Sequence, residues 1–182
     1  MRKQIRYGVW ETNSSSTHSC YIRRGNYGQD LTLKNHIEDD GYLHTEFGEF
    51  GWEVNDYSDS LTKLKYALTM VVETECRYKP MQNEYDTVEF EETEGFKEID
   101  NLIANKLDCA GVIVDSEMKV DKYDSIWNKG VTMIGIEHDG YIDHQSCEDF
   151  SSLQGFLNHY CLTLEEFIFD TDVVLHIDND NY

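Results

Sequence analysis

Carboxylates are the side chains of this chain whose number and spacing could do chemistry. The densest group lies in a stretch of the sequence that contains no lysine or arginine, from Pro80 to Phe96. Clustered carboxylates can bind a cationic protein surface, or they can hold a divalent metal ion. The group comprises Glu84, Asp86, Glu89, Glu91, Glu92 and Glu94.

The alternation of Val88 and Phe90 with acidic residues predicts a strand that presents Glu89 and Glu91 on one face. Two residues along a strand span about 6–7 Å, which is similar to the phosphate spacing of a nucleic-acid strand. Such a row could occupy an arginine-lined groove that normally holds DNA. The alternative is a solvated edge strand whose charge prevents aggregation.

A second acidic group extends over Glu38–Asp59 and is interleaved with aromatic residues. Aromatic side chains give contact area at low entropic cost, and carboxylates pair with arginine or lysine on a partner. The alternative is a long loop that its aromatic side chains hold against the core. The acids are Glu38, Asp39, Asp40, Glu46, Glu49, Glu53, Asp56 and Asp59, and the aromatics are Phe47, Phe50, Trp52 and Tyr57.

Two further groups of polar residues favour ordinary loops. Glu137–Asp139 and Asp143–His144 flank a turn and could ligate a metal ion only if they converge, so a polar turn is favoured and no metal or other cofactor is expected. Ser14–His18 places hydroxyls beside an imidazole, but neighbouring residues in a loop rarely have nucleophile–base geometry. No catalytic residue is therefore assigned, and we expect a protein that is not an enzyme.

The whole chain shares the acidic bias. It has 15 basic and 36 acidic side chains, for a formal charge of −21, and no lysine or arginine follows Lys129. This charge disfavours anionic membranes and free nucleic acid as partners, and it favours fast association with cationic surfaces. The five widely spaced cysteines and the absence of a signal peptide indicate reduced thiols in a cytosol.

The pattern of apolar and turn residues predicts a single α+β domain over residues 1–182, with a mainly antiparallel sheet and three to four packed helices. These elements would position the acidic residues. Apolar residues at helical spacing predict helices from about residue 59 to 75 and from 93 to 107, and shorter ones at 150–160 and 163–169. Strands are expected at 4–10, 18–22, 42–47, 111–115 and 173–177. Residues 131–137 and 141–143 are expected to form a hairpin around Asp139-Gly140.

One stretch of the sequence carries a family resemblance. Tyr7–Ser19, which contains Glu-Thr-Asn-Ser-Ser-Ser-Thr-His-Ser, resembles an N-terminal signature of small proteins from phages and mobile elements of Firmicutes. Leu162–Asp170, followed by a short β run, is also similar to that group. Within it, the length and acidity resemble a type II-A anti-CRISPR protein, an inhibitor of Cas9.

The resemblance implies a phage protein that acts in the cytoplasm of the infected bacterium, as a monomer or small homo-oligomer. Its implied partner is Cas9 or the Cas9–guide RNA complex, whose positive channel holds nucleic acid. An acidic DNA mimic could hinder target-DNA binding or cleavage there. Two alternatives remain open: a metal-dependent hydrolase or nuclease that uses clustered carboxylates, and a phage structural or assembly protein.

Overall fold

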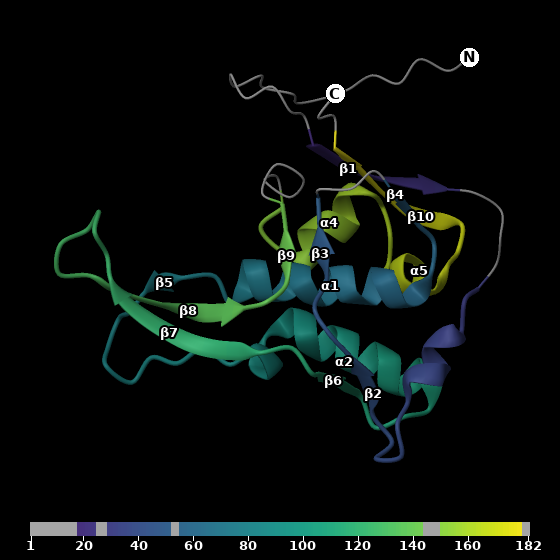
Figure 1. Cartoon of the computed structure of the whole chain (residues 1–182), viewed down its shortest axis with the longest axis horizontal. Helices are drawn as coiled ribbons and strands as arrows, with labels where there is room; N and C mark the ends of the chain where they lie inside the picture. Colours follow the sequence, from purple (N-terminus) through teal and green to yellow (C-terminus); the bar gives the residue numbers. More distant parts are fainter. Residues whose placement is uncertain (1–17, 25–28, 52–54, 144–149, 180–182) are drawn as a thin grey trace.

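A long helix, α1 (Ser60–Glu75), lies at the centre of the molecule (Figure 1). The computed structural model describes residues 18–24, 29–51, 55–143 and 150–179. Asp59 caps α1, because its carboxylate accepts a hydrogen bond from the backbone N–H of Thr62. The apolar side chains of α1 are not confined to one stripe, and it is buried from Leu64 to Val72 except at the partly exposed Lys65. The helix predicted at this position is confirmed, and its burial on several sides makes it the core of the fold.

The other helices pack around α1. Helix α2 (Glu94–Leu107) lies along one side, and α4 (Leu153–His159) and α5 (Leu164–Phe169) lie on the other (Figure 1). Tyr66 of α1 contacts the rings of Phe156 and Phe167 at centroid distances of 5.6 and 6.2 Å. Each of these four helices was expected from the sequence.

Side-chain caps define where these helices begin. Thr93 caps α2, and Ser152 caps α4. Thr163 and Glu166 form a capping box at the start of α5, in which each side chain accepts a hydrogen bond from the other residue's backbone N–H. Helix α2 ends at Asp108, whose φ of 56° places it in the left-handed region that aspartate tolerates.

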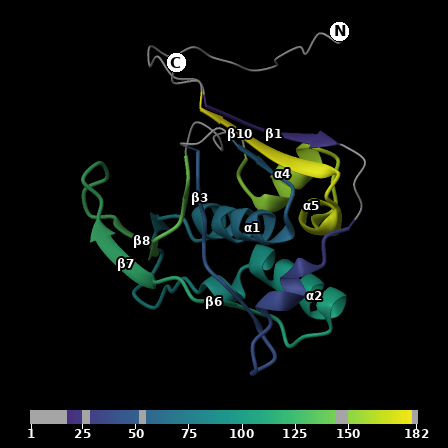
Figure 2. The same ribbon diagram turned by 45° about the vertical axis from the view of Figure 1, so that its right-hand side comes forward.

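Four small sheets surround the helices. Strands β1 (His18–Arg24), β10 (Val173–Asn179) and β4 (Asn55–Tyr57) form one antiparallel sheet, with β10 in the middle (Figure 2). Strands β5 (Lys79–Pro80), β8 (Thr132–His138) and β7 (Met118–Asp124) form the other. Two parallel pairs join β2 (Leu43–Thr45) to β6 (Val112–Val114), and β3 (Glu49–Phe50) to β9 (Tyr141–Ile142). The α+β class is confirmed, and its antiparallel character is partial.

The predicted hairpin around Asp139-Gly140 is wrong. Strand β8 ends at His138, and β9 leaves it to pair with β3. Gly140 lies so close to Phe47 that an added Cβ would stand 2.4 Å from that residue's Cβ. Close packing against Phe47 and Gly48, which directly precede β3, therefore directs the chain from one sheet to another, whereas the turn sequence alone favours a hairpin.

The true hairpin joins β7 to β8 through residues 125–131. These two strands and their turn, which we call the hairpin arm, project from the helical body (Figure 1). Gly130 adopts a φ of +83° in the turn, which glycine allows without strain. Two short 3₁₀ helices, η1 (Thr32–His36) and η2 (Phe90–Glu92), complete the described elements. The strand predicted at 4–10 lies outside the described residues.

Candidate partner-binding surfaces

The first acidic group does not form the predicted strand. Phe90 is 1% exposed and packs edge-on against Phe47, with ring centroids 5.4 Å apart. The chain around this anchor turns into η2, so Glu89 precedes a 3₁₀ helix that contains Glu91 and Glu92. Burial of the aromatic ring therefore overrides the alternating pattern, and no regular row of carboxylates exists in this segment.

Part of the first group stabilises its own loop. The Asp86 carboxylate accepts hydrogen bonds from the backbone and side-chain N–H groups of Asn83, and from the backbone N–H of Gln82. These hydrogen bonds, led by that from Gln82, lower the pKa of Asp86 below its usual value. Glu92 pairs with Lys97 at 3.0 Å. Glu84, Glu89, Glu91 and Glu94 are exposed.

The second acidic group acquires partners from a distant part of the chain. The parallel pairing of β2 with β6 brings residues 38–49 beside residues 108–117, and the backbone N–H of Asp115 donates to the carbonyl of Thr45. The N–H of Phe47 donates to the Ser116 hydroxyl at 2.7 Å. The resulting set of exposed carboxylates, which we call the acidic edge, comprises Glu38, Asp39, Asp40, Glu46, Glu49, Asp108, Asp115 and Glu117.

One imidazole links the two halves of the acidic edge. His44 Nε2 lies 3.0 Å from Asp40 Oδ2, and its Nδ1 lies 3.1 Å from Asp115 Oδ2. Hydrogen bonding to Asp40, reinforced by Asp115, outweighs partial burial and raises the pKa of His44. Hydrogen bonds from Tyr42 and His44 lower the pKa of Asp40. His44 thus holds together a carboxylate from the turn before β2 and one from the segment after β6.

Few lysines neutralise the acidic edge. Lys65 approaches Glu46 at 3.6 Å, and this pair is partly exposed. Exposed ion pairs of this kind contribute little to stability. Most of the remaining carboxylates lie in turns and loops that flank the paired strands β2 and β6, and this pairing lowers the entropic cost of holding them for a partner.

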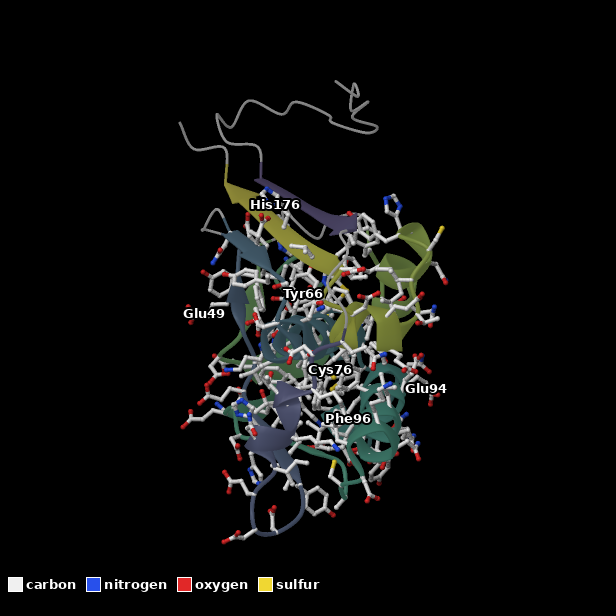
Figure 3. All side chains as sticks on the ribbon, turned by 90° about the vertical axis from the view of Figure 1, so that its right-hand side faces the viewer. Glu49, Tyr66, Cys76, Glu94, Phe96 and His176 are labelled. Atoms are coloured by element: carbon white, nitrogen blue, oxygen red, sulfur yellow. The ribbon has the colours of Figure 1, made fainter. Side chains whose placement is uncertain are left out.

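The remaining members of the second acidic group lie outside the acidic edge. Asp56 pairs with the His176 side chain across β4 and β10, and Asp59 is the cap of α1. Glu53 lies outside the described residues. Figure 3 shows Glu49 and Glu94 on opposite sides of the body. Members of the two acidic groups therefore lie on opposite sides of the body.

Buried titratable groups connect elements of the core. Lys63 has no exposed surface and donates to the carbonyls of Asp170 and Val173 at 2.7 and 3.1 Å, which ties α1 to the start of β10. Burial lowers the pKa of Lys63 to about 8. Glu73 accepts a hydrogen bond from the N–H of Ile142 at 2.7 Å, and burial raises its pKa to about 7. These contacts assign both side chains a structural role.

Exposed apolar side chains gather on the hairpin arm. Ile126 and Trp127, at its tip, are 80% and 87% exposed. Val120 and Tyr123 on β7 are each more than two-fifths exposed. Adjacent exposed apolar side chains of this size are typical of protein interaction sites.

Comparison with family models, with curated proteins and with solved structures gave no match to this chain. Within the described ranges, no group of three or more histidine, cysteine or carboxylate side chains has an arrangement that could hold a metal ion. No helix in the same ranges combines the length and apolar character needed to cross a membrane.

Sequence reasoning found five of the eight residues of the acidic edge and missed Asp108, Asp115 and Glu117. No local signal marks them, because they join the others only through pairing between strands about seventy residues apart. A weak signal marked His44, which lies between the apolar Leu43 and the small Thr45 and so faces outward from a strand whose other side is buried.

Proposed function

We propose that this protein is a non-enzymatic, phage-encoded inhibitor that binds guide-loaded Cas9 and hinders target-DNA binding or cleavage. It would act in the cytoplasm of the infected bacterium. The observation that carries the proposal is the acidic edge, a set of exposed carboxylates that lie mostly in the turns and loops flanking the paired strands β2 and β6, with little neutralisation by lysine among the described residues. The choice of Cas9 depends on the resemblance of Tyr7–Ser19 and the C-terminal segment.

Inhibition would rest on charge substitution. Target DNA presents phosphates to a positively charged channel, and carboxylates can pair with the same arginines and lysines. Carboxylates on turns and loops that paired strands anchor lose less conformational freedom on binding than those of a flexible acidic tail. For this reason we place the acidic edge first among the candidate interfaces, and the exposed acids of Glu84–Glu94 second.

The hairpin arm supplies a second kind of contact. Trp127 combines a large apolar surface with high exposure, which is the character of a side chain that anchors an interface in a partner's pocket. Carboxylates would steer the encounter, and the aromatic tip would slow dissociation.

The test compares two triple charge reversals with the same change in net charge. One variant carries Asp39→Lys, Glu49→Lys and Glu117→Lys on the acidic edge. Its matched control carries Glu89→Lys, Glu91→Lys and Glu92→Lys in the first acidic group. A gel-shift series measures target-DNA binding by guide-loaded Cas9 with each variant over a range of salt concentrations.

We expect the acidic-edge variant to lose at least about tenfold in inhibitory potency, while the control keeps most of it. Inhibition by the unmodified protein should weaken as salt rises, because salt screens exposed charges. Loss of potency in the control alone would move the interface to Glu84–Glu94. Unaltered DNA binding in the presence of the unmodified protein would refute the proposal.

A further inference from the structure

The outer edge of β7 is open. In the sheet β5–β8–β7, β7 pairs with β8 alone, and no described strand covers its other edge. The strand is seven residues long and exposed along much of its length. An open edge presents backbone N–H and C=O groups that can pair with an added strand.

The charge order of β7 favours pairing with itself. Its sequence from Met118 to Lys122 is Met-Lys-Val-Asp-Lys, so Lys119 and Asp121 flank Val120 symmetrically. In a two-fold antiparallel pair, one residue meets its own copy, and residues equally spaced on either side meet each other. Centred on Val120, the pairing places each Lys119 opposite the other copy's Asp121, and valine opposite valine.

The neighbouring centres are less favourable. Centring on Asp121 opposes two carboxylates, and centring on Lys122 opposes two ammonium groups, both of which destabilise a strand pair. Centring on Tyr123 leaves only three residues of each strand paired, because β7 ends at Asp124. The centre at Val120 engages five residues of each strand and brings together unlike charges only.

The arm is also a place where two copies of a strongly acidic chain can approach. From Met118 to Gly130 the basic side chains outnumber the acidic ones, Lys119, Lys122 and Lys129 against Asp121 and Asp124. Tyr78, which directly precedes β5, holds β7 in place: its hydroxyl donates to Asp121 at 3.1 Å and its ring contacts Tyr123. The open edge is therefore ordered before any partner arrives.

We propose that β7 is a self-association edge, through which a second copy of this chain adds in antiparallel register centred on Val120. The two sheets β5–β8–β7 then form one continuous sheet across the two-fold axis. A five-residue strand pair is a small interface, so the dimer is weak and dissociates on dilution.

The first experiment measures the mass of the full-length protein by sedimentation velocity from micromolar to near-millimolar concentration. We expect a reversible monomer–dimer equilibrium. Val120→Lys places two ammonium groups at the two-fold axis and should weaken dimerisation at least tenfold. Tyr85→Lys makes the same charge change at a side chain that is 82% exposed and outside the strand, and should leave it unchanged. Circular dichroism checks that both variants are folded.

The second experiment reads the register through disulfide formation. Val120→Cys places two thiols directly opposite each other, within the range that a disulfide spans, and should cross-link the dimer. Tyr123→Cys places its two thiols several residues apart and should not. The unmodified protein, run in parallel, corrects for the exposed Cys161. The proposal would be overturned if the protein stays monomeric at every concentration. It would also be overturned if the Tyr123→Cys variant cross-links and the Val120→Cys variant does not.

Discussion

Replacement of Glu73 by glutamine should change how the stability of this protein depends on pH. Glu73 lies on α1, and its Oε1 accepts a hydrogen bond from Ile142 on β9. Burial raises the pKa of this carboxyl from 4.5 to about 7, and the nearby Asp143 adds to the shift. Between these two values the folded protein keeps a proton that the unfolded chain has released. Stability therefore falls as pH rises from about 4.5 to about 7.

The size of this effect follows from the shift. One pKa unit corresponds to about 1.4 kcal/mol, so the full displacement from 4.5 to about 7 sets an upper bound of ~3.5 kcal/mol. The carboxyl keeps some contact with solvent, which screens its interactions, so we expect about 1–2 kcal/mol. Glutamine preserves the acceptor for Ile142 and carries no charge. The variant should be more stable than the parent by this amount at pH 8 and nearly equal to it at pH 5.

The measurement is urea unfolding followed by circular dichroism at several pH values between 5 and 8. Glu98→Gln, an exposed substitution on α2, is the matched control for the loss of one negative charge. Its difference from the parent should stay small throughout. If the free energy gained by Glu73→Gln is the same at pH 5 and pH 8, the reasoning from burial is wrong.

Three further changes test other parts of the structure. Asp115→Asn should lower the pKa of His44 toward 6.5, which an NMR titration would measure. In the unmodified protein the pKa of His44 is raised, so its contribution to stability is full below pH 6.5 and is lost as pH rises through the pKa of the folded state. Lys63→Met leaves two buried carbonyls without their donor and should cost about 2–4 kcal/mol in urea unfolding. An unchanged midpoint would contradict its role as a tie between α1 and β10. Trp127→Ala should leave thermal stability within about 0.5 kcal/mol while weakening the proposed interaction with Cas9 at least tenfold, which calorimetric titration would measure. Equal affinity would exclude the tip from the interface.

The helices of this fold could be predicted because their signals are local. Leu64 and Leu68 repeat at helical spacing, and Thr163 with Glu166 marks the start of α5 within four residues. Burial of α1 on several sides could not be predicted, because it depends on packing by α2, α4 and α5, which come later in the sequence.

Strand partners were harder to predict than strands. The sequence correctly indicates strands near β2, β6 and β10, but nothing local pairs β2 with β6. The Asp139-Gly140 turn signal was outweighed by packing of Gly140 against Phe47. In the candidate site, burial of Phe90 dispersed one acidic group, and the β2–β6 pairing enlarged the other. Both effects depend on tertiary contacts, so neither could be predicted from the composition of the sequence.

The position of β10 between β1 and β4 has a consequence for synthesis on the ribosome. Neither neighbour can acquire its hydrogen-bonding partner until Val173–Asn179 has left the exit tunnel, although β1 emerges about 150 residues earlier. During that delay, the early strands expose unpaired backbone that could associate with other nascent chains. Completion of this sheet must therefore wait for synthesis of Val173–Asn179, and pairing between segments about 150 residues apart should slow folding.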